Sequence, residues 1–340
     1  MVKINKTLVI PNGYKSNLDL RHTEMAINKI KNHFEGELSA SLNLLKVSAP
    51  LLVIEGRGIN DNLNGIERMV SFEALDINNK QIEIVQSLAK WKRMALARYG
   101  FVLGEGLYTN MIAIRRDERL DNLHSVYVDQ WDWEKVISKE QRNLTTLITE
   151  VQKIYKAIKS TESYLYQLHP ELKPVLSDDI YFTTTQELED LYPDLTSKQR
   201  EDRVTQKYGA VFIMQIGGLL RSGKKHDGRS PDYDDWTLNG DILFWNPILE
   251  RAIEISSMGI RVDEKTLLKQ LALANNEDRR VLEYHQSILN GSLPSTIGGG
   301  IGQSRLCMFL LKKAHIGEVQ ASVWNDQIVK DCRENQINLM

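Results

Sequence analysis

Four glycines stand ahead of an arginine in the stretch "STIGGGIGQSR", which ends at Arg305. An interior glycine costs about 0.5–1 kcal/mol relative to alanine, so the run indicates either a sharp turn or a close approach to a ligand. We expect a strand whose missing side chains admit a flat ligand, followed by a helix that begins near Gln303. Arg305 would then lie in the first helical turn, where the helix dipole favours anions, and could bind phosphate or stack on a ring. Close packing between a helix and a strand would explain the glycines equally well.

A long hairpin is predicted over residues 107–136, where two β-rich segments flank the charged loop "RDERLDNL". Arg115 ends the first strand, and the loop could fold over a bound anion. On the return strand side chains alternate between faces, so Gln130 and Asp132 share one face and could bind an ammonium group. An exposed hairpin face would show the same pattern.

A third candidate group lies in "EISSMGIR", residues 254–261. Glu254 stands near Ser257, and a carboxylate here could hold magnesium beside phosphates. In a straight strand residues seven apart face opposite ways, so Glu254 and Arg261 share a site only if the strand bulges. We expect that bulge at Gly259. Without it, the segment is an exposed strand end.

Other motif-like stretches carry no chemistry. The segment "GLLRSGKK" at 218–225 is close to a phosphate-binding loop, but Lys225 replaces the required hydroxyl residue and a poor helix follows, so we predict a surface turn. The glycine run lacks the third glycine of a dinucleotide fingerprint, because Arg305 holds that position. The histidines and cysteines show no zinc-site spacing.

The elements that position these residues are predicted from apolar spacing and capping signals. Helices are expected over 22–39, 144–168, 196–209, about 264–274 and about 277–290. Strands are expected in "LLKVSAPLLVIEG", which Pro50 interrupts, in "QIEIV" running into a helix, and in "AVFIMQIGG", "DILFWNP" and "AIEISSMGIRV". Hairpin pairs of strands with helices grouped between them predict an α+β fold with an antiparallel sheet. We expect one domain over 1–340, with an N-terminal arm at 1–20 and a C-terminal tail at 326–340.

Composition narrows the function classes. The chain has 340 residues, 42% of them hydrophobic and 26% charged, and its net charge of −2 gives no basic surplus for binding nucleic acid or membranes. No apolar run approaches the ~18 residues of a membrane helix, and the N-terminus does not look like a signal peptide. Cys307 and Cys332 suit a reducing compartment. We expect a cytoplasmic protein that binds neither nucleic acid nor membrane.

Together these segments resemble the class II aminoacyl-tRNA synthetase superfamily. The stretch "LLKVSAPLL" is similar to motif 1, whose proline lies at a dimer interface, "AIRRDE" to motif 2 and "GGGIGQSR" to motif 3. Within the superfamily, "QSLAKWKR", "HSVYVDQWDWE", "PDYDDW", "LNGDILFWNP" and "SSMGIRVD" resemble blocks of the ammonia-dependent, A-type aspartate–ammonia ligases. The resemblance covers residues 20–325 and implies a class II synthetase-like antiparallel sheet flanked by helices, in a homodimer. Two departures are Gln86, where histidine is familiar, and a short stretch between "DYDDW" and "LNGD".

The resemblance implies a reaction in asparagine biosynthesis. L-Aspartate, ammonia and the co-substrate ATP would give asparagine, AMP and pyrophosphate through a β-aspartyl-adenylate, with Mg²⁺ as the metal. The residue types agree with this chemistry, because joining a carboxylate to a phosphate brings two anions together and requires positive groups.

The resemblance also implies roles at the nucleotide. Arg115 would hold the α-phosphate, and Arg305 would contact the γ-phosphate and adenine. Glu254 and Asp241 would bind magnesium. The other ATP-binding candidates are Ser125, Ser257, Gly300 and Gly302.

For aspartate, Lys92 and Arg261 would bind the side-chain carboxylate, where adenylation must occur. The α-amino end would be fixed by Ser87, Gln130 and Asp132. Ammonium, with a pKa of about 9, must lose a proton before it attacks. Either Asp61, in the polar loop "GRGINDNLNG", or Asp234 would bind or deprotonate it.

Two alternatives remain beside this interpretation. An aspartyl- or asparaginyl-tRNA synthetase would usually carry an anticodon-binding barrel of ~100 residues ahead of the core, whereas motif 1 here begins near residue 45. A non-catalytic synthetase paralogue would be expected to lose its site residues, yet Arg115, Glu254 and Arg305 are all present.

Overall fold

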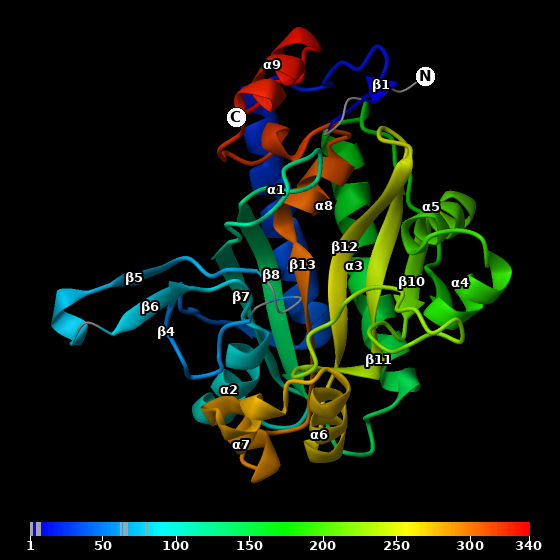
Figure 1. The fold of residues 1–340 in the computed structure, drawn as a ribbon. Helices are drawn as coiled ribbons and strands as arrows, with labels where there is room; N and C mark the ends of the chain where they lie inside the picture. Colours follow the sequence, from blue (N-terminus) through cyan, green and yellow to red (C-terminus); the bar gives the residue numbers. More distant parts are fainter. Residues whose placement is uncertain (1–2, 5–7, 62, 64–66, 79) are drawn as a thin grey trace.

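The computed structural model describes residues 3–4, 8–61, 63, 67–78 and 80–340, and its centre is an eight-stranded sheet (Figure 1). Neighbouring strands are antiparallel except at the two edges, where the outermost pairs are parallel. In spatial order the strands are β3 (Leu44–Lys46), β7 (Gly106–Ile114), β8 (Tyr127–Val136), β13 (Thr296–Gly302), β12 (Arg251–Arg261), β11 (Asp234–Asn246), β10 (Ala210–Met214) and β9 (Tyr181–Thr184). The predicted antiparallel α+β fold is therefore confirmed.

Two long helices, α1 (Leu20–Leu42) and α3 (Leu144–Leu168), pack together across one face of this sheet (Figure 1). Each begins at a side-chain cap: Asp19 accepts a hydrogen bond from the His22 N–H, and Asn143 accepts one from the Thr146 N–H. Their apolar faces join the sheet in one core, where Phe34 packs against Trp131 with 4.6 Å between ring centroids. The helix predicted at 144–168 is confirmed with the same bounds.

Shorter helices surround the sheet: α2 (Ala89–Tyr99), α4 (Thr185–Leu191), α5 (Ser197–Tyr208), α6 (Glu264–Leu273), α7 (Glu283–Leu289), α8 (Gln303–Leu310) and α9 (Asp326–Glu334). Three short 3-10 turns lie at Leu75–Ile77, Glu277–Val281 and Ile316–Glu318. The single helix expected at 277–290 is wrong in detail. It divides at Leu282, whose backbone is extended (φ −73°, ψ 150°). None of the helices in the described ranges is long and apolar enough to cross a membrane.

Two small sheets complete the fold. Strands β4 (Leu52–Ile54), β6 (Gln81–Ile84) and β5 (Ser71–Glu73) form an arm that extends away from the body (Figure 1). Pro50 separates β3 from β4, so the segment that we expected as one interrupted strand contributes to two sheets. The second small sheet pairs β1 (Lys3–Ile4) with β2 (Val9–Ile10); residues 1–2 and 5–7 of the expected N-terminal arm lie outside the described residues.

Strand β12 has a bulge, but its extra residue is not Gly259, where we predicted it. A second register shift does lie opposite Gly259, between Asp234 and Asn239, and its extra residues belong to β11. Ile242 of β11 pairs with Ser256 whereas the next residue, Leu243, pairs with Glu254, so Ile255 is the extra residue. This irregularity lets Glu254 and Arg261 face the same side of the sheet, where both line one cavity. Gly259 serves another purpose. A Cβ there would lie 2.8 Å from Asp234 Oδ1, so the glycine allows that carboxylate to approach the strand.

Candidate active site

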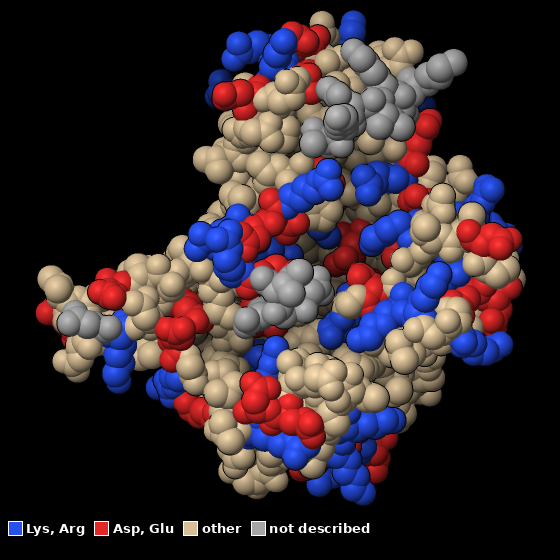
Figure 2. Space-filling model, viewed as in Figure 1, with Lys and Arg blue, Asp and Glu red and all other residues tan. Residues whose placement is uncertain are grey.

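A cavity of about 360 Å³ lies over the face of the large sheet that α1 and α3 leave uncovered. Figure 2 shows basic and acidic side chains gathered around a hollow on this face. Arg115, directly after β7, and Arg305, in the first turn of α8, both line it. Thus the two arginines that motivated the sequence interpretation open onto one cavity.

Most of the predicted site residues share this cavity. Those that line it are Ser87, Lys92, Arg115, Ser125, Gln130, Asp132, Asp234, Glu254, Ser257, Arg261, Gly300, Gly302 and Arg305. Asp61 and Asp241 do not line it and are buried just behind it, each beside a residue that does. The structure therefore places them one layer behind the positions of direct contact that we expected.

The glycines of β13 allow polar side chains from β8 to cross the sheet surface. Gly298 pairs with Glu134, and a Cβ on Gly298 would lie 2.0 Å from Glu134 Oε2. A Cβ on Gly300 would lie 2.5 Å from the Gln130 Oε1 atom. Much of the space that we predicted for a flat ligand is thus filled by neighbouring carboxylate and amide groups. The helix after the glycines begins at Gln303, as predicted.

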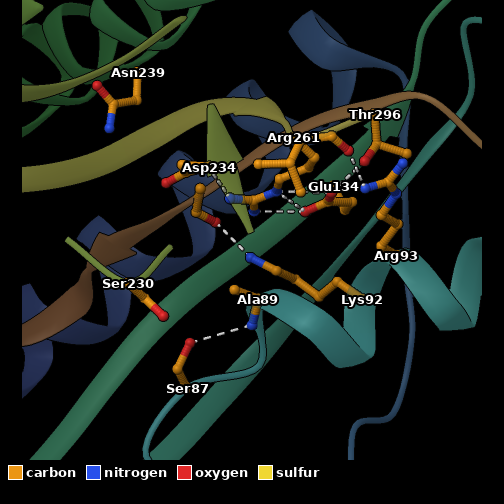
Figure 3. Close-up of polar contacts among 12 residues, drawn as sticks. Ser87, Ala89, Lys92, Arg93, Glu134, Ser230, Asp234, Asn239, Arg261 and Thr296 are labelled. Carbon is orange, nitrogen blue, oxygen red and sulfur yellow. Dashed lines mark hydrogen bonds and ion pairs between the residues drawn. The ribbon is translucent and has the colours of Figure 1, made fainter. Parts of the chain in front are cut away.

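At one end of the cavity Arg261 is held between two buried carboxylates (Figure 3). Its Nε and Nη2 donate to Glu134 at 2.9 Å and 2.7 Å, and its Nη1 donates to Asp234. Thr296 Oγ1 donates to the same Glu134 at 2.7 Å. Burial acts to raise the pKa of Glu134, but attraction and hydrogen bonds from Arg261 outweigh it, and the pKa is lowered. For Asp234 burial is the stronger effect, and its pKa is raised.

Lys92 enters the same end from α2. Its Nζ donates to Asp132 Oδ1 at 3.0 Å and to the Gly299 carbonyl at 2.9 Å, and burial lowers its pKa. Asp132 Oδ2 is buried and has no hydrogen-bond partner among the described residues. One carboxylate oxygen therefore remains for a cationic group. Ser87 lies beside the start of α2, where its Oγ accepts from the Ala89 N–H at 3.2 Å (Figure 3).

The other end of the cavity carries the cations predicted for the nucleotide. Arg305 Nη1 donates to the Glu254 carbonyl at 3.1 Å and lies 3.8 Å from its Oε1. Arg115 Nη1 lies 3.9 Å from Glu118 Oε2, and its buried Nε has no partner among the described residues. Burial opposes ionisation of Glu254, but Arg305 and Arg229 together lower its pKa. This end can therefore hold an anion close to guanidinium groups whose N–H donors are not all used within the protein.

Several site residues were missed by the sequence analysis. Arg229 lines the cavity and pairs with Asp241; it lies in the irregular stretch after "GLLRSGKK", just ahead of the block "PDYDDW", and no pattern singled it out. Glu134 fixes Arg261, and Arg93 holds the neighbouring backbone by donating to the carbonyls of Val262 and Pro294 at 2.8 Å and 2.9 Å. For Glu134 the available signal was its place two residues after Asp132 on the same face of β8.

Asp61 belongs to a buried polar cluster behind the cavity wall. Ser230 lines the cavity, and its Oγ contacts Asp61 Oδ1 at 3.2 Å and Asp232 Oδ1 at 2.8 Å. Asp232 in turn accepts from Lys90 and His285, both at 2.9 Å. Burial raises the pKa of Asp61 to about 6, although Lys90 opposes the shift. Residues 62, 64 and 65 of the polar loop, and residue 66 after it, lie outside the described residues.

A magnesium ion fits the carboxylates at the end of the cavity that carries Arg115 and Arg305. The described residues hold no group of three or more metal-binding side chains, but Mg²⁺ beside a triphosphate commonly uses one or two carboxylates plus phosphate oxygens. Glu254 lines the cavity, and Asp241 Oδ1 is buried without a partner among the described residues. Burial raises the pKa of Asp241 to about 6, which still leaves a carboxylate at neutral pH.

Comparisons with known proteins add a family and a fold. The family described as aspartate-ammonia ligase matches residues 21–336. A Clostridium perfringens protein named aspartate–ammonia ligase is 60% identical over 333 residues, which are 98% of this chain and 99% of that protein. A Clostridium tetani protein of the same name is 59% identical over 339 residues, which are 100% of this chain and 99% of that protein.

Solved structures give the fold. An asparaginyl-tRNA synthetase from Pyrococcus horikoshii, complexed with asparaginyl-adenylate, superposes with a TM-score of 0.65 at 16% identity, over 89% of this chain and 70% of that one. An Entamoeba histolytica asparaginyl-tRNA synthetase gives a TM-score of 0.62 at 12% identity, over 88% and 67%. The chain therefore has the class II aminoacyl-tRNA synthetase fold.

Proposed function

The chain belongs to the aspartate–ammonia ligase family, and from that premise we propose how its cavity divides the work of the reaction. The protein is a ligase that makes asparagine from aspartate and ammonia with ATP as co-substrate. One observation supports the division most strongly: Arg115, Arg305, Lys92 and Arg261 all line one cavity. Arg305 contacts Glu254, and Arg261 lies seven residues farther along β12, so the two arginines lie toward opposite ends of that strand.

Aspartate would bind at the Lys92 and Arg261 end. An ammonium group has three donors and Lys92 uses two of them within the protein, so one N–H remains for the substrate's side-chain carboxylate. Arg261 likewise has five donors, and its bonds to Glu134 and Asp234 occupy three of them. Asp132 Oδ2, together with Gln130 and Ser87, would fix the α-amino end.

ATP would bind at the Arg115 and Arg305 end. Glu254 and Arg261 are seven residues apart on β12, roughly 20 Å at the rise of a strand, which is enough to place a nucleotide and an amino acid end to end. Arg115 would contact the α-phosphate and Arg305 the γ-phosphate and adenine, with Ser125 and Ser257 on the walls. Arg229 adds a third cation beside them.

Activation then follows from charge. The aspartate carboxylate and the α-phosphate repel each other, and arginines held by the protein lower that repulsion without reorganising at the moment of reaction. Attack of the carboxylate on the α-phosphorus gives the β-aspartyl-adenylate and releases pyrophosphate. Ammonia then attacks the activated carbonyl and releases AMP.

Glu254 and Asp241 would hold Mg²⁺ at the nucleotide end. When bound, the ion would neutralise phosphate charge. Asp241 would then have two cationic partners, because its carboxylate already forms an ion pair with Arg229.

Two carboxylates are candidates for accepting the proton of ammonium. Asp234 lines the cavity, but Arg261 binds its Oδ1. Asp61 lies behind Ser230, and its buried Oδ2 has no partner among the described residues. Asp61→Asn should raise the KM for ammonium if Asp61 is the acceptor and should leave it unchanged if Asp234 is. Asp234→Asn should raise the KM for aspartate in either case, because it removes a charged partner of Arg261.

We further propose a homodimer formed through the edge of the sheet at β3. Leu45, Leu51 and Leu52 lie in the segment around Pro50 and are 61%, 47% and 43% exposed, so this segment presents large apolar side chains. Leu51→Glu should shift the sedimentation coefficient from dimer to monomer.

We also propose that residues 1–340 act as one catalytic domain in the cytoplasm, where the two buried free cysteines stay reduced.

Turnover with defined substrates tests the proposed function. Purified protein should release AMP and pyrophosphate only when aspartate and ammonium are both supplied, and glutamine should not replace ammonium. Turnover that requires tRNA instead of ammonium would contradict the proposal and favour a synthetase.

A further inference from the structure

We propose that Asn122 is a positioning residue that joins the N-terminal arm to the ATP end of the cavity; the inference rests on the proposed function of that end. Here the arm means residues 8–19 of the N-terminal arm, and not the β4–β6–β5 sheet. The β7–β8 loop means residues 115–126. Asn122 is 1% exposed although it lies in a charged loop. A buried asparagine in such a loop indicates that its side chain is used within the protein.

The Asn122 side chain acts as a strand partner for Val9 in the arm. Its Oδ1 accepts from the Val9 N–H at 2.8 Å, and its Nδ2 donates to the Val9 carbonyl at 2.9 Å. The same Nδ2 donates to the Ala314 carbonyl at 2.8 Å. Both amide hydrogens and the oxygen are therefore used, and all three bonds reach segments far away in the sequence.

The backbone of Asn122 extends this junction to the cavity wall. Its carbonyl accepts from the Ile316 N–H at 2.8 Å. Ile316 lines the cavity, and so do Leu123 and Ser125, which follow Asn122 directly. One residue thus connects the arm, the return limb of the β7–β8 loop and the segment after α8.

Asp121 stabilises the turn locally, whereas Asn122 fixes the position of the turn relative to the rest of the protein. Asp121 Oδ1 accepts from the N–H groups of Leu123 and His124 at 2.7 Å and 2.9 Å, so the turn is stabilised locally. Those bonds do not fix the turn against the rest of the molecule. Asn122 does so on one side, and the contact between Ser125 Oγ and Ser322 Oγ at 2.7 Å does so on the other.

The arm has attachments of its own, so loss of Asn122 need not release it. Tyr14 donates to Glu318 at 3.0 Å, and Leu8 and Ile10 pack in a small core with α9. Figure 1 shows the arm, α9 and the β7–β8 loop at the same end of the sheet. The arm is therefore a fixed support against which the loop is held.

This arrangement separates the effects on the two substrates. Without the Asn122 side chain, the wall that carries Leu123 and Ser125 keeps only the backbone bond to Ile316 and the contact with Ser322, so ATP must order part of the wall and binds more weakly. Lys92 and Arg261 are held by other contacts, so aspartate binding should be unaffected. We expect Asn122→Ala to raise the KM for ATP roughly tenfold, the loss that follows from one or two buried hydrogen bonds, and to change the KM for aspartate less than about twofold.

Val9→Pro provides a second test because proline removes the N–H that Asn122 accepts. It should reproduce part of the rise in the KM for ATP, and the double variant should be no worse than Asn122→Ala alone, since both changes break the same junction. Asn28→Ala, at an exposed asparagine of α1, is the matched control and should change neither KM.

Direct ATP binding by equilibrium dialysis, with thermal unfolding beside it, keeps the inference separate from the proposed function. Weaker ATP binding by Asn122→Ala with an unfolding temperature near that of the parent protein supports the junction. The junction would be overturned by an equal rise in the KM values for ATP and aspartate, by unchanged ATP binding, or by additive effects of the two substitutions. Absence of aspartate- and ammonium-dependent AMP release by the parent protein would instead overturn the proposed function.

Discussion

Gly298→Ala should disable the aspartate end of the cavity although it adds a single methyl group. Gly298 does not have a positive φ, so alanine is compatible with the backbone there. The new Cβ would, however, lie 2.0 Å from Glu134 Oε2 and 2.7 Å from Arg261 Nη2. It would enter the ion pair that orients Arg261. Both groups are buried, and of the two only Arg261 borders the cavity, so the methyl group must strain the pair or push Arg261 toward the cavity.

The magnitude follows from the two costs that the methyl group imposes. Overpacking a well-packed interior costs about 1–3 kcal/mol, and separating one partner of a buried ion pair costs about 3–5 kcal/mol. Partial displacement should therefore destabilise the fold by about 3 kcal/mol. With an unfolding entropy of about 2.1 cal/mol/K per residue over 340 residues, that corresponds to a loss of about 4 °C in Tm. If the same displacement moves Arg261 away from the substrate carboxylate, kcat/KM for aspartate should fall by roughly 100-fold.

Steady-state kinetics and differential scanning calorimetry measure both effects. Gly36→Ala in α1 is the control: a Cβ there meets no heavy atom within 4 Å, so it should raise stability by about 0.5–1 kcal/mol and leave activity unchanged. Glu134→Asp in the Gly298→Ala background should restore part of the activity, because the shorter side chain withdraws its carboxylate. A Gly298→Ala variant with the activity and Tm of the parent protein would refute the reasoning.

The remaining predictions concern the nucleotide, the metal and the buried acid. Arg115→Ala or Arg305→Ala should abolish aspartate-dependent exchange of pyrophosphate into ATP while the sedimentation coefficient stays unchanged; retained exchange in both variants would remove the proposed nucleotide site. Asp241→Asn should raise the magnesium concentration for half-maximal rate about tenfold, which a metal titration measures, and an unchanged titration would exclude Asp241 as a ligand. Folding raises the pKa of Asp61 from 3.8 to about 6, so its ionisation costs stability as the pH rises through that range. Asp61→Asn should therefore unfold at a higher temperature than the parent protein at neutral pH and lose that advantage in acid, and calorimetry at several pH values would show the opposite order if the shift has the other sign.

The sequence predicted those features that depend on local pattern. Leu144–Leu168 is a helix with the expected bounds because its apolar spacing is strict and Asn143 caps it. Arg305 lies in the first turn of α8, which begins at Gln303 directly after the glycine strand β13, as expected. The cavity likewise contains most of the residues that alternation and motif resemblance selected.

Features set by distant partners could not be predicted in this way. The bulge lies at Ile255 and not at Gly259, because its position is decided by register with β11. Glu134 looks like any polar strand residue until Arg261, 127 residues away, is placed beside it. Arg229 lies in an irregular stretch, where no periodicity indicates which way a side chain points.

The central claim is that aspartate and ATP meet within one cavity and react through the side-chain carboxylate of aspartate. Turnover with heavy-oxygen-labelled aspartate tests it most directly, with the AMP analysed by mass spectrometry. Aspartate labelled in the side-chain carboxylate should transfer one labelled oxygen to AMP, and aspartate labelled in the α-carboxylate should transfer none. Unlabelled AMP from the first substrate, or labelled AMP from the second, would contradict the account.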